Sequence, residues 1–191
     1  VKMVKFNEGQ PSQFFHRYTY DADNRIVLQE TSIDGKLWDR DAKYEYYGHG
    51  PLRRTEIGED KIQGMDYVYT IQGWLKGINH ASLDANLDPG EDNIGGNLFA
   101  NDAFGMNLSY YTGDFKRDGS PYNGLSEPTA LKPVADHDLF NGNISTWTSN
   151  IQPVPGPDPL QYEQLTGQQF RYDELNRIKK SDFSTYSSGS W

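Results

Sequence analysis

The strongest constraint on the fold is a short unit that recurs four times along the chain. Each copy begins with an aromatic residue, has tyrosine two residues later, glycine or asparagine six residues after the start, and isoleucine or leucine eight residues after it. The copies occupy residues 18–26, 44–52, 67–75 and 170–178. The aromatic and tyrosine positions alone define the frame, so agreement at the other two positions indicates a real repeat.

Each unit predicts a β-hairpin. Aromatic and polar residues alternate over residues 14–20, as in a strand with one aromatic face. The glycine or asparagine is expected to take positive φ in a bulge after a type I turn, and an aspartate at the turn start can bond the turn backbone. The expected motif residues are Tyr18, Tyr20, Asp21, Asn24, Arg25, Tyr44, Tyr46, Gly50, Tyr67, Tyr69, Gly73, Trp74, Phe170, Tyr172, Asp173, Asn176 and Arg177. The cations after the turns, Arg25, Arg53, Lys76 and Arg177, are expected to lie along the rings.

The repeat spacing divides the chain into four parts. Residues 1–80 hold three hairpin repeats, 81–152 form an irregular Gly-rich insert, 153–160 a Pro-rich connector, and 161–191 a further repeat. Short strands are expected inside the insert at residues 107–112 and 143–148. With 19 Gly and 10 Pro and no sustained helical periodicity, the chain is predicted to be all-β, with repeated antiparallel hairpins in a spiralling sheet. Both ends are interpreted as cuts from a longer polypeptide.

Composition excludes several classes of function. The net charge of −9 and pI near 4.8, without clustered cations, argue against nucleic acid. No apolar stretch is long enough to span a bilayer, so membrane insertion is not expected. There is no cysteine, hence no disulfide. Only 35% of residues are hydrophobic while 14% are aromatic, which favours a sheet that is wetted on at least one face.

The first and last units, Tyr-Thr-Tyr-Asp-Ala-Asp-Asn-Arg-Ile and Phe-Arg-Tyr-Asp-Glu-Leu-Asn-Arg-Ile, resemble YD repeats of the RHS/teneurin family. The segment 67–79, with its Gln-Gly-Trp-Leu block, resembles a form found in very large RHS proteins of gliding Gram-negative bacteria. The resemblance implies a spiralling β-sheet cocoon that encloses or displays a toxin or effector domain. It also implies secretion or display at the bacterial cell surface, with the type IX machinery as a possible route.

The chain also departs from the family pattern. The second and third copies have Tyr47 and Thr70 in place of the aspartate. The self-cleaving Asp-Pro-x-Gly motif of many RHS cores is absent, because Asp88-Pro89-Gly90 does not match it. No autoprotease activity is therefore expected, and the resemblance implies partners of another kind: the remaining repeats of the same polypeptide, an enclosed effector and the secretion machinery.

One acidic segment has a weak resemblance to a calcium loop. Asp84, Asn86 and Asp88 place oxygen ligands at i, i+2 and i+4. Pro89 then stands where such a loop needs glycine, and Gly95 where it needs a bidentate glutamate. A solvated acidic loop is the preferred interpretation, and Ca²⁺ is the candidate if a metal binds.

No catalytic constellation is evident, so an enzyme is not expected and no cofactor is implied. The four histidines are scattered without metal-ligand spacing, and neither a Gly-x-Ser-x-Gly elbow nor a cysteine nucleophile exists. The leading hypothesis is a structural wall segment of a shell. The alternative is a surface adhesin that stacks glycan on aromatic side chains, with Trp38, Trp74 and Trp147 as candidates.

Overall fold

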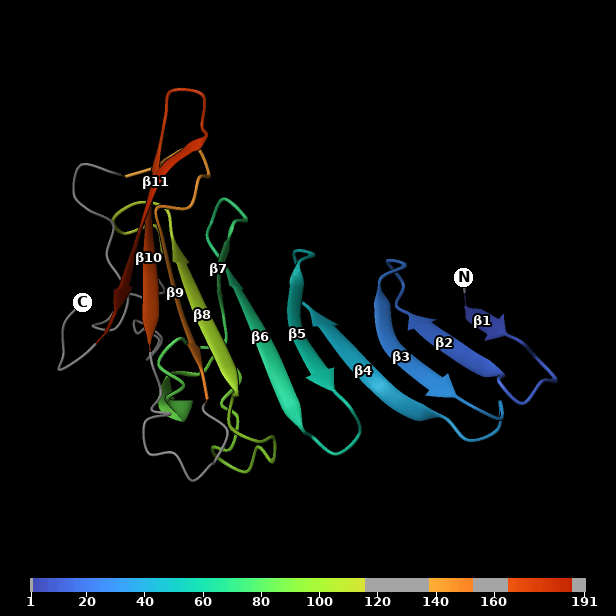
Figure 1. Cartoon of the computed structure of the whole chain (residues 1–191). Helices are drawn as coiled ribbons and strands as arrows, with labels where there is room; N and C mark the ends of the chain where they lie inside the picture. The colour runs from blue at the N-terminus through green and yellow to red at the C-terminus, as the bar shows by residue number, and fades with distance from the viewer. Residues whose placement is uncertain (1, 116–137, 153–164, 187–191) are drawn as a thin grey trace.

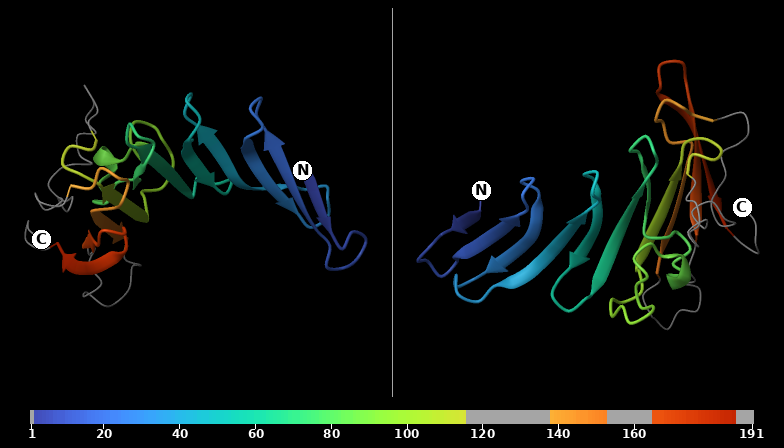
Figure 2. Two further views of the ribbon diagram at one scale, coloured as in Figure 1. Left: turned by 90° about the horizontal axis from the view of Figure 1, so that it is seen from above. Right: turned by 180° about the vertical axis from the view of Figure 1, so that it is seen from behind.

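In the computed structural model the chain forms one antiparallel sheet of eleven strands (Figure 1). The structure describes residues 2–115, 138–152 and 165–186. The strands follow one another in chain order from β1 to β11, so each strand pairs with its neighbours in sequence. The predicted all-β class is confirmed, and the sheet is open, with β1 and β11 at opposite ends in every view (Figure 2).

The strands are short and the helical content is a single turn. The strands are β1 (Met3–Phe6), β2 (Phe14–Tyr20), β3 (Ile26–Ser32), β4 (Asp39–Tyr46), β5 (Leu52–Ile57), β6 (Gln63–Tyr69), β7 (Leu75–Ile78), β8 (Phe104–Ser109), β9 (Thr146–Ile151), β10 (Thr166–Tyr172) and β11 (Ile178–Thr185). The one helical element among the described residues is the 3₁₀ turn η1 (Ala85–Leu87). It lies in residues 79–103, between β7 and β8, which we call the docking loop.

The four repeat turns share one backbone geometry. In each turn the amide six residues after the first aromatic donates to the carbonyl three residues earlier, over 2.9–3.2 Å. That residue has positive φ in all four copies: 61° at Asn24, 119° at Gly50, 84° at Gly73 and 60° at Asn176. The strand register also shifts at the second tyrosine of each copy, as a bulge requires. The predicted left-handed turn residue is confirmed in every repeat.

Side chains at the turn start support this backbone in different ways. Asp21 Oδ1 accepts the amide of Arg25 over 2.9 Å, and Asp173 accepts the amide of Arg177 over 3.0 Å. In the third copy the Thr70 hydroxyl accepts from an amide four residues on, over 3.2 Å. Threonine therefore supplies the acceptor that the missing aspartate would have provided.

The cations after the turns do not share one role. The Arg25 guanidinium lies over the Tyr46 ring at 4.5 Å from its centroid, as expected. Arg53 is exposed, and Arg177 is paired with its own turn aspartate at the surface. Lys76 differs from the expectation that it lies along the rings. It is buried, and its Nζ lies 2.8 Å from a carboxylate oxygen of Asp114, its acidic partner.

Tyrosine hydroxyls tie successive hairpins together. In three places the second tyrosine of a hairpin donates to the carbonyl that opens the return strand of the preceding hairpin. The pairs are Tyr46 to Ile26 at 2.7 Å, Tyr110 to Leu75 at 2.7 Å and Tyr172 to Ile144 at 2.9 Å. A buried carbonyl at the bulge thus receives a donor from the next unit.

These hydrogen bonds from tyrosine hydroxyls to carbonyls of the preceding hairpin, which we call the tyrosine ladder, reveal a fifth repeat that the sequence pattern missed. Tyr110, directly after β8, acts as its second tyrosine, Gly142 supplies positive φ of 88°, and Ile144 lies two residues before the return strand β9. The Ser145 amide donates to the Ser109 carbonyl over 2.8 Å and closes the hairpin. The strands expected at 107–112 and 143–148 are observed as β8 and β9, each displaced by three residues, because the chain leaves the sheet after Ser109 and rejoins it at Thr146.

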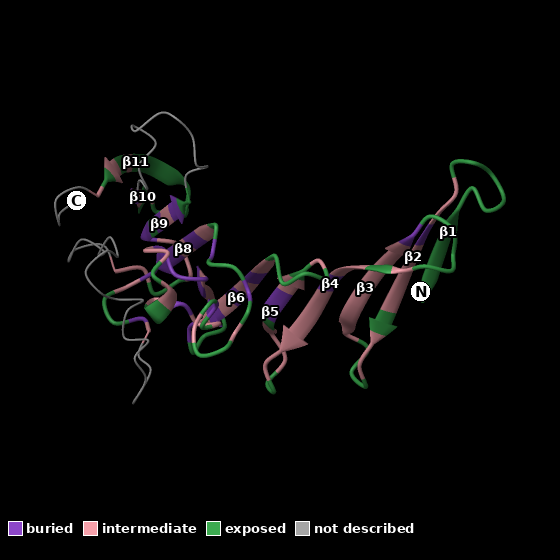
Figure 3. Ribbon diagram, turned by 90° about the horizontal axis from the view of Figure 1, so that it is seen from below, coloured by how far each residue is buried: buried purple, intermediate pink, exposed green. Residues whose placement is uncertain are grey.

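Burial is concentrated in the middle of the described sheet, and β1 and β11 at its two edges are mostly exposed. Buried residues gather on β5, β6, β8 and β9, where the docking loop packs, while β2 to β4 are mostly intermediate (Figure 3). Among the described residues, eight hydrophobic side chains are buried against eighteen polar or charged ones. The sheet is therefore held by aromatic packing and polar networks more than by an aliphatic core.

Two expectations, the Pro-rich connector and the absence of a membrane-spanning segment, depend on which residues the structure describes. The Pro-rich connector at 153–160 lies outside the described residues, as do residues 161–164 and 187–191. Over the ranges that are described, no helix is long and apolar enough to cross a membrane.

We predict that Gly50→Val lowers the free energy of unfolding by about 1–3 kcal/mol, because a β-branched residue resists positive φ. Gly48→Val is the matched control: both glycines belong to one turn and have open space where a Cβ would stand, but Gly48 lacks positive φ. Urea unfolding of both variants measures the difference. Equal losses at the two positions would contradict the left-handed turn as the cause.

Candidate functional site

The docking loop separates the three residues of the calcium-like segment. Asp84 and Asn86 are exposed, and Asp84 Oδ1 accepts the Asn86 amide over 3.0 Å to cap η1. Asp88, by contrast, is only 2% exposed. The expectation of a solvated loop is thus correct for the first two residues and wrong for Asp88 and the nearby Asp92, because Asp92 pairs with a residue of the sheet and Asp88 accepts amides of its own loop.

That sheet residue is Arg54, which lies directly opposite Asp66 in the pairing of β5 with β6. Its Nη1 donates to Asp66 Oδ2, and its Nη2 donates to Asp92 Oδ1 over 2.6 Å. The ring of Phe99, also from the docking loop, lies under the guanidinium at 4.6 Å. One buried arginine therefore fastens the docking loop to the sheet by one ion pair, to Asp92, and a cation–π contact, while its second ion pair joins β5 to β6.

Two glycines leave the space that the guanidinium occupies. A Cβ at Gly64, on β6, would overlap Arg54 Nη2, and a Cβ at Gly90, in the docking loop, would overlap Nη1. Any side chain at either position would displace the arginine from its carboxylates. The absence of a side chain at these two positions is thus part of the site.

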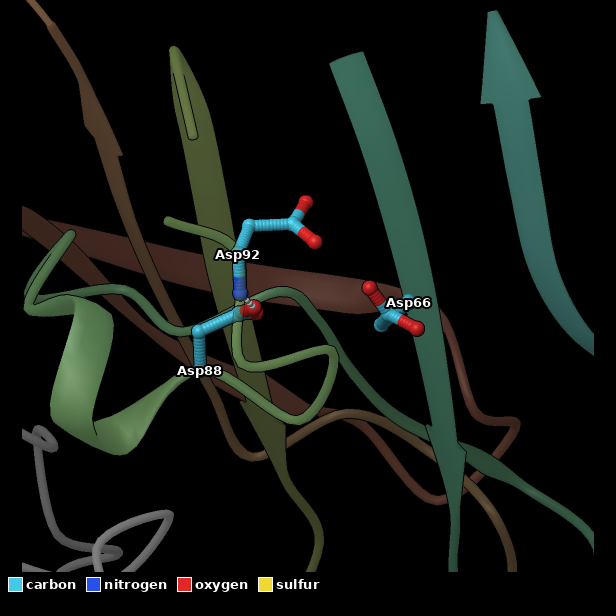
Figure 4. Close-up of side chains that lie close together, drawn as sticks. All are labelled: Asp66, Asp88 and Asp92. Atoms are coloured by element: carbon cyan, nitrogen blue, oxygen red, sulfur yellow. Dashed lines mark hydrogen bonds between the residues drawn. The ribbon is translucent and has the colours of Figure 1, made fainter. Parts of the chain in front are cut away.

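Four carboxylates surround this single guanidinium, and we call Asp66, Asp88, Asp92 and Asp102 the acid cluster. Oxygens of the first three lie within 4.8 Å of one another (Figure 4). Asp102 contacts the cluster through a hydrogen bond with Asp88. Four formal negative charges against one positive charge leave the buried group unbalanced when all are ionised.

Burial, together with the surplus of negative charge, raises the pKa values of three members of the cluster, Asp66, Asp88 and Asp102. Burial, followed by the charge of Asp88, raises the pKa of Asp102 to about 9. Burial raises the pKa of Asp66 to about 7 even though Arg54 opposes the shift, and it also raises the pKa of Asp88. At neutral pH Asp102 is therefore protonated and can donate its hydrogen to Asp88.

Polar side chains complete the surroundings of the acid cluster. Asn97 donates from Nδ2 to Asp92 Oδ1 over 2.9 Å, and Gln63 donates to Asp102 Oδ1 over 3.0 Å. The Asp66 amide donates to Asn79 Oδ1 over 2.7 Å. Asp88 Oδ2 accepts two amides of its own loop. The arrangement is chemically suited to hold protons or a cation, since oxygen acceptors greatly outnumber donors.

Sequence reasoning missed Arg54 and Asp66 as site residues. A signal was present: Asp66 alternates with Gly64 and Val68 on the inward face of β6, where a lone carboxylate has no apolar role. The partner Asp92 could not be identified in advance, because the fold of an irregular loop decides which acid meets the arginine.

The three tryptophans proposed for glycan stacking have separate surroundings. Arg17 lies over the Trp38 ring at 4.2 Å, and Trp74 packs against Tyr110 with centroids 4.9 Å apart. Trp147, on β9, is 40% exposed. Of these rings, Trp147 offers the most accessible surface.

Neither a scan of protein-family models nor a search of curated proteins finds a match to this chain.

We predict that Arg54→Met lowers the free energy of unfolding by about 3–5 kcal/mol, because it leaves buried carboxylates without their cation. The neighbouring Arg53→Met, which removes the same charge at an exposed position, is the control and should change stability by about 0.5 kcal/mol or less. Chemical denaturation of both variants tests this. Similar stability of the two would show that Arg54 does not fasten the loop.

We also predict a pH-dependent effect of Asp102→Asn. Because the folded pKa of Asp102 lies above its unfolded value, its contribution to stability is complete below about pH 4 and is lost as pH rises through about 9. An asparagine cannot ionise but can still donate to Asp88. The Tm of the variant relative to wild type should therefore rise between pH 4 and pH 9 by at least roughly 2–4 °C.

The control is Asp84→Asn, at an exposed carboxylate whose pKa is lowered by hydrogen bonds to Asn86. Its Tm difference from wild type should stay constant between pH 5 and pH 9, because the Asp84 carboxylate is ionised throughout that range. A constant offset for Asp102→Asn as well would contradict the protonated state of Asp102.

Proposed function

We propose that this chain is a non-catalytic structural segment in the wall of a large secreted β-sheet shell of the RHS/YD-repeat kind. The observation that carries the proposal is the uninterrupted meander of eleven strands with a free strand at each edge. Repeat proteins of this kind grow by adding units to an edge, and each new unit covers the backbone groups of the last.

Both edge strands expose apolar side chains. On β1, Val4 and Phe6 are 45% and 59% exposed, and on β11, Ile178 and Phe183 are 61% and 64% exposed. Unpaired strands with exposed apolar residues favour pairing with a further strand. Further repeats of the same polypeptide are the partners that suit these edges best, since they would continue the existing hairpin pattern.

The tyrosine ladder supports the same proposal. Each hairpin is fixed to the preceding one by side-chain and backbone hydrogen bonds, without a second layer over β2 to β4 in the described chain. A single layer that is stable only through its neighbours suits a wall with an inside and an outside. If the chain belongs to the RHS/YD-repeat family, as we propose, it also encloses or displays an effector domain, is secreted or displayed at the cell surface, and contacts the secretion machinery.

The experiment is hydrogen–deuterium exchange and imaging of the full-length parent polypeptide beside the 191-residue chain. In a continuous wall, the outward-pointing amides of β1 and β11 should be protected in the parent and exchange rapidly in the isolated chain. Imaging should place the eleven strands in the wall of a closed hollow particle.

The opposite result is equally informative. If the edge amides exchanged rapidly in the parent too, and the particle were open or rod-like, the wall proposal would fail. Glycan binding would then be the better candidate. The favourable observation for it is an open cleft of about 750 Å³ beside the second and third repeat turns, lined by rings that include Tyr47, Tyr69 and Tyr111.

A further inference from the structure

The charge of the acid cluster requires a counter-charge beyond Arg54. Asp66, Asp88 and Asp92 are 3%, 2% and 1% exposed, so water cannot screen them well. Arg54 bonds one oxygen of Asp66 and one of Asp92, and the remaining oxygens are left to other partners. Buried carboxylates without a partner are costly unless they are protonated or bind a cation.

Two buried oxygens mark where a cation would lie. Asp92 Oδ2 has no hydrogen-bond partner, although its side chain is almost fully buried. Asp88 Oδ1 is also buried, and no nitrogen or hydroxyl of the described residues bonds it; its neighbour is the carboxyl group of Asp102. These free oxygens come from carboxylates whose ligand atoms approach within 4.8 Å, a spacing that one ion could bridge with modest adjustment (Figure 4).

We propose that the acid cluster binds one Ca²⁺ ion through carboxylate oxygens of Asp66, Asp88 and Asp92, and that the ion locks the docking loop onto β6. All candidate ligands are oxygens, which hard cations prefer, and the site has no sulfur or imidazole ligand among its members. Irregular loop geometry suits Ca²⁺, which accepts variable coordination, better than Mg²⁺. The proposal is independent of the wall function.

The proposed site differs from the calcium-like pattern in the sequence. Asp84 caps η1 at the surface by accepting the amide of Asn86, and neither residue takes part, whereas Asp66 joins from the sheet. An ion there would connect β6, through Asp66, to the docking loop, through Asp88 and Asp92. Binding of the ion should therefore strengthen the attachment of the loop to the sheet.

The test is calorimetric titration of the 191-residue chain with CaCl₂ alone, after treatment with EDTA. We expect saturable binding with a Kd on the order of 10⁻⁵–10⁻⁴ M and a higher Tm in Ca²⁺ than in EDTA.

Variants locate the ion. Asp88→Asn retains an oxygen for the loop amides but loses ligand charge, and it should weaken Ca²⁺ binding by about tenfold or more. Asp92→Asn, which can keep an oxygen toward Arg54, should do the same and provides a second reading if the first variant folds poorly. The exposed Asp84→Asn should bind as the wild type does.

Three results would overturn the proposal. Absence of saturable heat and of any Ca²⁺-dependent change in Tm would show that protons alone balance the cluster. Equal weakening by Asp84→Asn would assign the binding to surface acids. Unchanged binding in both folded variants, Asp88→Asn and Asp92→Asn, would exclude the acid cluster as the site.

Discussion

The left-handed residue at the end of each repeat turn is the constraint on which the rest of the sheet depends. With positive φ at Asn24, Gly50, Gly73 and Asn176, the chain reverses through a bulge, which fixes the register of each hairpin. A register slip by one residue would move every side chain of a strand to the other face. The tyrosine hydroxyls could not then reach the carbonyls of the preceding hairpin.

Much of this regular part could be predicted from the sequence, because its interactions are local. Turn chemistry, strand alternation and the offset from aromatic to glycine all lie within nine residues. The fifth repeat escaped detection for the same reason: residues inserted between Tyr110 and Gly142 separate the two halves of its motif. A pattern defined by fixed spacing fails where the fold closes a turn through a long insert.

The acid cluster could not be predicted, since its members meet only through tertiary structure. Arg54 and Asp66 are cross-strand partners, a fact that depends on the register set by the turn between β5 and β6. Asp88 and Asp92 arrive from an irregular loop that carries no periodic pattern. From the sequence alone, every acidic residue of that loop was an equally good partner for a cation. The buried position of Arg54 decides that Asp92 is the one that pairs with it.

The two halves of the sheet reach stability by different physical means. β2 to β4 remain half exposed and rely on aromatic contacts and the hydrogen bonds between hairpins. Over β5 and β6 the docking loop covers the sheet, and burial there brings polar groups out of water as well as apolar ones. Because unpaired buried charge is so costly, the loop can stay docked only while Arg54 and further counter-charge are present. In this part of the molecule, the docking loop can therefore cover the sheet only if the charges of the acid cluster are balanced.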